Sequence, residues 1–162
     1  MKCLNCGGQM VVMEECDYLY DAGGLRVQVE TPIDVRRCPD CGDVEVSIPD
    51  LEGLHRAMAK CLIEQRPRLK PEELRFLRLF LGMSGVELAR QMSVAPETVS
   101  RWENGQQPMG GSAEKLLRLM VVQANGFEEP TPWLADVANE EPRTEPAKKA
   151  RVVGHHWELC PA

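Results

Sequence analysis

Two copies of a Cys-x-x-Cys-Gly motif constrain this chain more than any other feature of its sequence. One copy is "CLNCG" at residues 3–7 and the other is "CPDCG" at residues 38–42. Two intervening residues let one tight turn direct both sulfurs at a single ion, and the glycine takes up the backbone conformation that lets nearby N–H groups point at the thiolates. Four thiolates are a ligand set that tetrahedral Zn²⁺ prefers. We therefore predict one structural Zn²⁺ per chain, bound by Cys3, Cys6, Cys38 and Cys41.

Other interpretations of the cysteines are two disulfides, free thiols, or a thiol redox protein. A redox motif needs a reactive cysteine at a helix N-terminus beside positive charge, whereas both motifs here end in glycine and precede strand-like sequence. Four thiolate ligands also leave no open position for a water, so we expect no zinc catalysis and no enzyme. The start "MKCLNCGG" lacks the apolar segment of a secretory signal, and the chain has an odd number of cysteines, seven. Both observations indicate a cytoplasmic protein with reduced cysteines.

Residues 1–66 are predicted to form a small zinc-bound β-rich domain with a connecting helix. The runs Leu25–Glu30 and Asp43–Pro49 alternate between apolar and polar residues, as short antiparallel strands do. From Asp50, a plausible N-cap, the apolar spacing becomes helical. Only 5% of the residues in the whole chain are aromatic, and a small β module with few aromatic residues lacks a sufficient core. A bound zinc would therefore contribute about 10 kcal/mol or more to its folding. Cys16 and Cys61 are predicted to be small core residues, and His55 to be incidental on a charged helix face.

Residues 67–138 are predicted to form an all-α domain, which makes the fold class α+β. The helix boundaries come from Pro, Gly and capping residues. The first helix opens at Pro71 and ends at Gly82, the second opens at a Ser84/Glu87 capping box, the third runs from Pro96 to Asn104-Gly105, Ser112 caps the fourth, and Thr131-Pro132 starts the fifth. Residues 139–162 mix charge and proline with few apolar residues, so we expect a disordered tail.

Residues 84–105 have the layout of a helix-turn-helix, in which a capped helix and a tight turn precede a second short helix. The residues predicted to face the shared core are Leu88, Ala89, Met92, Val94, Val99 and Trp102. Glu97 and Arg101 then lie on the outer face at i and i+4. Arg101 suits a bidentate contact to guanine, and Glu97 suits a cytosine amino group or a contact that holds Arg101. Thr98, Ser100 and the polar loop 104–107 suit phosphate contacts.

In all, the predicted DNA-binding residues are Ser84, Pro96, Glu97, Thr98, Ser100, Arg101, Asn104 and Gln106. The chain as a whole carries a net charge of −6, but residues 68–123 hold eight basic and six acidic side chains. Of the three consecutive parts of the chain, residues 1–67, 68–123 and 124–162, this is the only one with a net positive charge and thus the only one whose field favours a polyanion. The alternative is an ordinary helical hairpin with Glu97 and Arg101 as a solvated ion pair.

The motifs "CLNCGG", "CPDCGD", "PEELRFLRLFLGMSGVELA" and "TVSRWENGQQP" resemble the bacterial YgiT-type zinc-finger proteins with an Xre-type helix-turn-helix domain, whose best-known members are the MqsA-like antitoxins. The resemblance covers residues 1–122. It implies four cysteine zinc ligands, base readers at Glu97 and Arg101, and a homodimer that represses a palindromic operator on double-stranded DNA. It also implies that the zinc domain binds a ribonuclease toxin.

The chain departs from the pattern of this family at three positions. Ser84-Gly85 stands where Thr-Gln is frequent, Glu97 replaces a frequent Asn, and Ala95 occupies a position where a capping Ser or Thr is usual. The first two changes are expected to alter operator specificity, and the third removes about 1 kcal/mol of cap energy. The sequence therefore predicts a dimeric, zinc-stabilised transcriptional regulator acting as an antitoxin. A stand-alone regulator, a thiol redox protein and a protein-binding scaffold are the alternatives.

Overall fold

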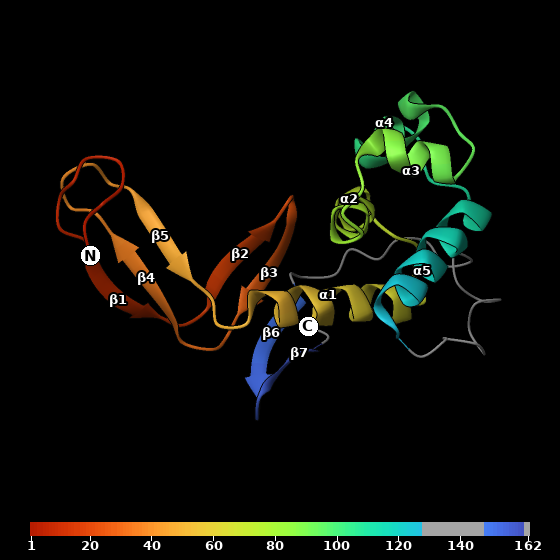
Figure 1. Cartoon of the computed structure of the whole chain (residues 1–162). Helices are drawn as coiled ribbons and strands as arrows, with labels where there is room; N and C mark the ends of the chain where they lie inside the picture. The colour runs from red at the N-terminus through yellow and green to blue at the C-terminus, as the bar shows by residue number, and fades with distance from the viewer. Residues whose placement is uncertain (128–147, 161–162) are drawn as a thin grey trace.

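The computed structural model describes residues 1–127 and 148–160, and it has a β-rich arm joined to a helical bundle by one helix (Figure 1). The strands are β1 (Val11–Glu15), β2 (Tyr18–Ala22), β3 (Leu25–Val29), β4 (Ile33–Arg37), β5 (Val44–Ser47), β6 (Lys148–Val153) and β7 (His156–Cys160). The helices are α1 (Leu51–Glu64), α2 (Pro71–Phe80), α3 (Gly85–Gln91), α4 (Pro96–Glu103) and α5 (Gly111–Asn125). The predicted α+β class is confirmed. No helix of the described residues is long and apolar enough to cross a bilayer.

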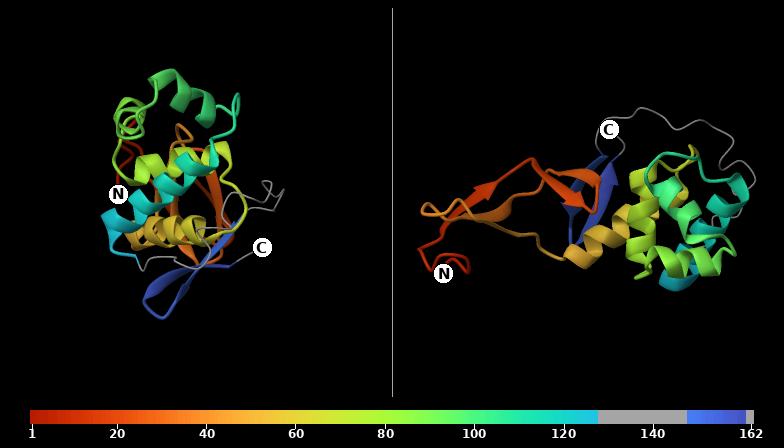
Figure 2. Two further views of the ribbon diagram at one scale, coloured as in Figure 1. Left: turned by 90° about the vertical axis from the view of Figure 1, so that its right-hand side faces the viewer. Right: turned by 90° about the horizontal axis from the view of Figure 1, so that it is seen from above.

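The arm is built from two sheets. The first has the order β1-β4-β5 and is antiparallel throughout, and the second has the order β2-β3-β6-β7. The strands predicted at Leu25–Glu30 and Asp43–Pro49 are confirmed as β3 and β5, each a little shorter than the alternating run. The two loops that carry the Cys-x-x-Cys-Gly motifs, residues 3–7 and 38–42, are called the knuckles here. They lie at the far end of the first sheet, and α1 runs from the arm into the helical bundle (Figure 2).

The expectation of a disordered tail is wrong for residues 148–160. Strand β6 pairs in parallel with β3, and β7 folds back on β6 through a turn at Gly154 and His155. Ala150 is fully buried, and Trp157 is 5% exposed with its indole N–H donating to the carbonyls of Pro49 and Asp50, 3.0 Å from each. The pairing partner is more than 100 residues away, so the composition of the tail could not show it. The remainder of the predicted tail, and the fifth helix predicted at Thr131, lie outside the described residues.

Helix α1 connects the two parts of the molecule. The Asp50 carboxylate accepts from the Gly53 N–H at 3.0 Å, so the predicted N-cap is confirmed. Leu54, Met58 and Leu62 are fully buried at helical spacing and belong to one apolar core that runs from the second sheet into the helical bundle. One continuous core thus joins the two regions, residues 1–66 and 67–138, that the sequence analysis predicts as separate domains.

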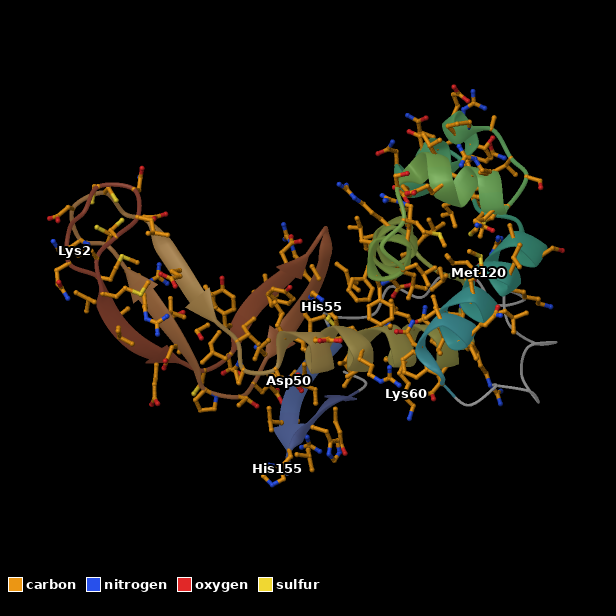
Figure 3. All side chains as sticks on the ribbon, viewed as in Figure 1. Lys2, Asp50, His55, Lys60, Met120 and His155 are labelled. Carbon is orange, nitrogen blue, oxygen red and sulfur yellow. The ribbon has the colours of Figure 1, made fainter. Side chains whose placement is uncertain are left out.

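Side chains around α1 correct two smaller predictions. Cys16 is exposed and Cys61 is half-buried, so neither is a fully buried core residue. His55 is not incidental, because its Nε2 lies 2.7 Å from the Tyr20 hydroxyl and its ring meets the edge of Phe76. Burial lowers the pKa of His55. These contacts place His55 where β2, α1 and α2 meet (Figure 3).

Arg118 of α5 holds the end of α1. Its side chain is 0% exposed and donates to the carbonyls of Leu62, Ile63, Gln65 and Pro67, at distances from 2.6 to 3.2 Å. It also donates to the fully buried Glu114 at 2.6 Å, and Glu114 in turn accepts from the Leu69 N–H at 3.0 Å. The last carbonyls of a helix have no partner within that helix. The Gln65 N–H donates to the Cys61 carbonyl, and Arg118 supplies a donor to the next two carbonyls of α1.

The boundaries of the bundle helices follow the sequence signals closely. Helices α2 and α4 begin at Pro71 and Pro96, and α3 begins after the predicted Ser84/Glu87 capping box. Helix α5 instead begins at Gly111 with Gly110 as its N-cap, so Ser112 is a first-turn residue rather than the cap. Four of the five predicted helices are thus present within the described residues.

Candidate metal centre and nucleic-acid interface

The four cysteines of the two motifs come together at the far end of the arm. Their Sγ atoms all lie within 4.8 Å of one another, with Cys3 to Cys41 at 3.7 Å and Cys6 to Cys38 at 3.4 Å. A disulfide requires about 2.05 Å, so these pairs are thiols. Four sulfurs at about 2.3 Å from a central ion stand about 3.8 Å apart in a regular tetrahedron. The observed spacing therefore fits one tetrahedral metal ion.

The two knuckles have matching backbone geometry. The N–H of Gly7 donates to the Cys3 carbonyl and the N–H of Gly42 donates to the Cys38 carbonyl, each at 2.9 Å. The two glycines have φ of +77° and +76°, a left-handed conformation that a side chain would strain. The backbone N–H of Cys41 points at the Cys38 sulfur and is the main reason that the pKa of Cys38 is lowered to about 7. The second knuckle thus favours thiolate at Cys38, the form that binds metal. At Cys6 the Gly8 N–H has the opposite effect to the contacts with the Cys38 and Cys41 sulfurs, and these contacts raise the pKa to about 12.

The surroundings of the cysteines do not match a thiol redox site. Neither knuckle lies at a helix N-terminus, because the elements nearest in the chain are β1, β4 and β5. The carboxylate of Asp43 lies 3.5 Å from the Cys3 sulfur, where a reactive thiol would instead have a positive charge nearby. The local chemistry fits a group of cysteines that could hold a metal ion better than it fits a redox site.

Helices α3 and α4 form the predicted helix-turn-helix. The Ser84 N–H donates to the Glu87 carboxylate at 2.7 Å, the Glu87 N–H donates back to Ser84 Oγ at 3.2 Å, and the first of these bonds lowers the pKa of Glu87. Four of the six predicted core residues are buried, namely Leu88, Ala89, Val99 and Trp102, whereas Met92 and Val94 are half-buried. Gly105, with φ of +69°, ends α4 as predicted.

The predicted DNA-binding side chains lie on the outer side of this unit. Seven of the eight are exposed, namely Ser84, Pro96, Glu97, Ser100, Arg101, Asn104 and Gln106, and Thr98 is half-buried. The Asn104 amide donates to Ser100 Oγ at 3.2 Å, so these two side chains contact each other on the free surface. The structure therefore presents Glu97 and Arg101 on an accessible face of α4.

An ion pair that the sequence reasoning missed holds α4 in place. Arg78 of α2 donates from two nitrogens to the Glu103 carboxylate, at 2.5 and 2.9 Å, and from a third to the Met83 carbonyl at 2.8 Å. Both side chains are about nine-tenths buried, with exposures of 11% and 12%. The pair fixes the C-terminal end of α4 on α2. An Arg and a Glu 25 residues apart gave no local signal of this contact.

Comparison with known proteins identifies the helical part only. Residues 74–122 match the family model described as helix-turn-helix, a range that runs from within α2 to within α5. This part of the chain is therefore a helix-turn-helix domain. No curated protein and no solved structure matches the chain. The knuckles and both sheets lie outside the matched residues.

Proposed function

We propose that this protein is a homodimeric, zinc-stabilised, DNA-binding transcriptional regulator with no catalytic role. The observation that carries the proposal is the accessible face of α4 within a segment that matches the helix-turn-helix family. A major groove about 12 Å wide admits one helix, and α4 is short, ends at Glu103 and is followed by the left-handed Gly105. In this proposal α4 enters the groove and Arg101 reads a guanine.

Zinc is the metal that the four-cysteine site fits best. Thiolates are soft ligands, and a tetrahedral set of four thiolates is typical of structural zinc. Bound zinc would keep both knuckles closed on each other and leave no ligand position for a substrate. Its role in the proposal is thus to stabilise the end of the arm.

The dimer interface that we propose is the outer face of α5. Leu116 and Leu119 are 42% and 37% exposed there, and the half-buried Met120 lies beside them at helical spacing. Two-fold symmetry on a palindromic operator places the two recognition helices about 34 Å apart, on one face of the duplex. An apolar stripe on the same domain as α4 gives the two protomers a shared surface without covering Arg101.

Within this class, our finer proposal is an antitoxin of the MqsA-like kind, with the zinc arm binding a ribonuclease toxin. The family resemblance of the knuckles supports it, and so does the charge of the first 67 residues. Residues 1–67 carry seven basic and twelve acidic side chains, which favours association with a basic partner. A stand-alone regulator is the alternative. Co-purification of a tagged copy with the product of the neighbouring reading frame distinguishes the two, because only an antitoxin would retain a small ribonuclease.

Arg101→Ala is expected to weaken binding to the preferred operator by about 1–3 kcal/mol, which is roughly 5- to 150-fold, because a bidentate guanine contact is lost. The operator is first selected from random duplexes, and affinity is then measured by fluorescence anisotropy over a range of salt. Arg75→Ala is the matched control, since Arg75 is exposed on α2 outside the predicted contacts. Equal affinity of the two variants would contradict the role of Arg101.

Leu116→Glu with Leu119→Glu is expected to convert the dimer to a monomer, because four carboxylates would meet at the proposed interface. Val86→Glu is the control, since Val86 is 54% exposed on α3. Sedimentation equilibrium gives the oligomeric state, and anisotropy gives the loss of operator affinity. A wild-type monomer at all concentrations, or an unchanged dimer in the double variant, would rule out this surface.

A further inference from the structure

A cleft lies where the arm, the connecting segment and the helical bundle meet. It has a volume of about 920 Å³ and takes its walls from the start of β3, the second half of α1, residues 65–70, the start of α2 and the β6–β7 hairpin. Small-molecule pockets are commonly about 300–1,000 Å³. The half-buried Ala57 and Leu159 supply apolar surface on its walls. In size and composition the cleft suits a small ligand.

The cleft is locally basic in an acidic protein. Six of the 19 Lys and Arg residues line it but only four of the 25 Asp and Glu residues do. The six are Arg26, Lys60, Arg66, Arg68, Lys70 and Lys148, and the four are Glu64, Glu72, Glu73 and Glu158. The lining therefore has a formal excess of two positive charges, six against four, in a chain whose net charge is −6. Among the described residues, Glu72 is the one lining carboxylate without an ion pair.

Most of these charges already have a partner. Glu73 pairs with Lys148 at 3.2 Å, Glu64 with Lys60 at 3.9 Å, and Glu158 with His156 at 3.3 Å. Arg68 is held by Glu114 at 3.7 Å and by the Met109 carbonyl, and Arg26 lies 3.6 Å from Asp21.

Arg66 and Lys70 differ from the other cations of the cleft. Within residues 1–127 and 148–160, no carboxylate lies within ion-pair distance of either side chain. They stand at the two ends of one five-residue stretch of the connecting segment, and both line the same cleft. The guanidinium of Arg66 can bind two oxygens of a phosphate or carboxylate in parallel, and the ammonium of Lys70 adds a point charge.

We propose that this cleft binds a small organic anion through Arg66 and Lys70, with the remainder of the ligand against Ala57 and Leu159. Its chemical class is a small molecule with a phosphate or carboxylate group. Such a ligand would contact the connecting segment, α1 and the β7 strand together, because all three line the cleft. It would thus stabilise the docking of the C-terminal hairpin onto the rest of the protein. If the protein is the regulator proposed above, the cleft is its effector site.

The test uses the full-length chain and three probes, namely inorganic phosphate, citrate and adenosine monophosphate, at constant ionic strength. Isothermal titration measures binding in the absence of DNA. Arg66→Gln with Lys70→Gln removes the proposed ligands, and Arg75→Gln with Arg90→Gln removes the same charge from exposed positions of α2 and α3 outside the cleft. Loss of two charge-assisted hydrogen bonds is expected to raise the dissociation constant at least tenfold. The control pair is expected to bind like the wild type.

Two outcomes overturn the proposal. One is the absence of saturable binding of all three probes. The other is equal weakening in both double variants, which would mean an adventitious ion only, attracted by net charge. Circular dichroism of each variant establishes that it is folded before titration. Because binding is measured without DNA, failure here leaves the operator experiment on Arg101 unaffected, and failure of that experiment leaves the anion site intact.

Discussion

Cys38→Ser is expected to release the bound metal and to unfold the far end of the arm, while α1 and the helical bundle remain folded. The knuckle end has almost no apolar core of its own, because its buried cluster within the described residues consists of Cys3, Met10 and Cys38. Two of these three side chains are ligands of the proposed metal. A structural zinc contributes about 10 kcal/mol or more to such a module. No apolar contact at this end could replace that contribution.

The unfolding is expected to stop before the second sheet. Val27, Val29 and Ala150 are fully buried and belong to the core shared with α1 and the bundle, so they do not depend on the metal. Ile33 and Val35 of β4 are buried in the same core. Hydrogen exchange should therefore lose protection at residues 1–14 and 36–47 and keep it at residues 18–35, 51–125 and 148–160. Metal analysis should fall from about one zinc per chain to none.

Cys16→Ser is the matched control for Cys38→Ser, since Cys16 is an exposed cysteine of the same arm outside the sulfur cluster. It should keep the metal and the exchange pattern of the wild type. Full metal content in Cys38→Ser would contradict the proposed ligand set. Loss of protection throughout α2–α5 would instead mean that the bundle depends on the arm for its stability.

The parts of the fold that the sequence predicted are those with local signals. Three such signals act over only a few residues, and the structure has each of them. They are the cysteine spacing within each knuckle, the Ser84/Glu87 capping box, and the prolines that open α2 and α4. The outer face of α4 was predictable for the same reason, since burial of Val99 and Trp102 fixes by helical geometry which side chains are left outside.

The parts that were missed depend on partners far away in the chain. Strand β6 pairs with β3 across 121 positions, as in the Val27–Lys148 pair, and the composition around Lys148 is too charged to indicate a strand. Its charge is compatible with folding because Glu73 of α2 lies 3.2 Å from the Lys148 ammonium. Such compensation is a property of the assembled structure. For the same reason, no short stretch of the sequence indicated the Arg78–Glu103 pair or the basic cleft.

Arg118→Ala is expected to destabilise the protein by about 3–5 kcal/mol, because it removes one partner of a buried ion pair. Glu114 is fully buried and would lose its closest cation, which lies 2.6 Å away. The carbonyls of Leu62, Ile63, Gln65 and Pro67 would lose a donor at the same time. Desolvated groups without partners each cost about 1–3 kcal/mol. The end of α1 and the segment leading to α2 would therefore loosen together.

A double-mutant cycle separates the ion pair from the helix cap. If the buried charge of Glu114 causes most of the loss, Glu114→Gln should restore much of it in the Arg118→Ala background. If the uncapped carbonyls of α1 cause it, Glu114→Gln should restore little and Arg118→Lys should restore more. Urea unfolding gives the four free energies, with Arg75→Ala as an exposed control expected to stay within about 0.5 kcal/mol of the wild type. Wild-type stability of Arg118→Ala would contradict the role assigned to this residue.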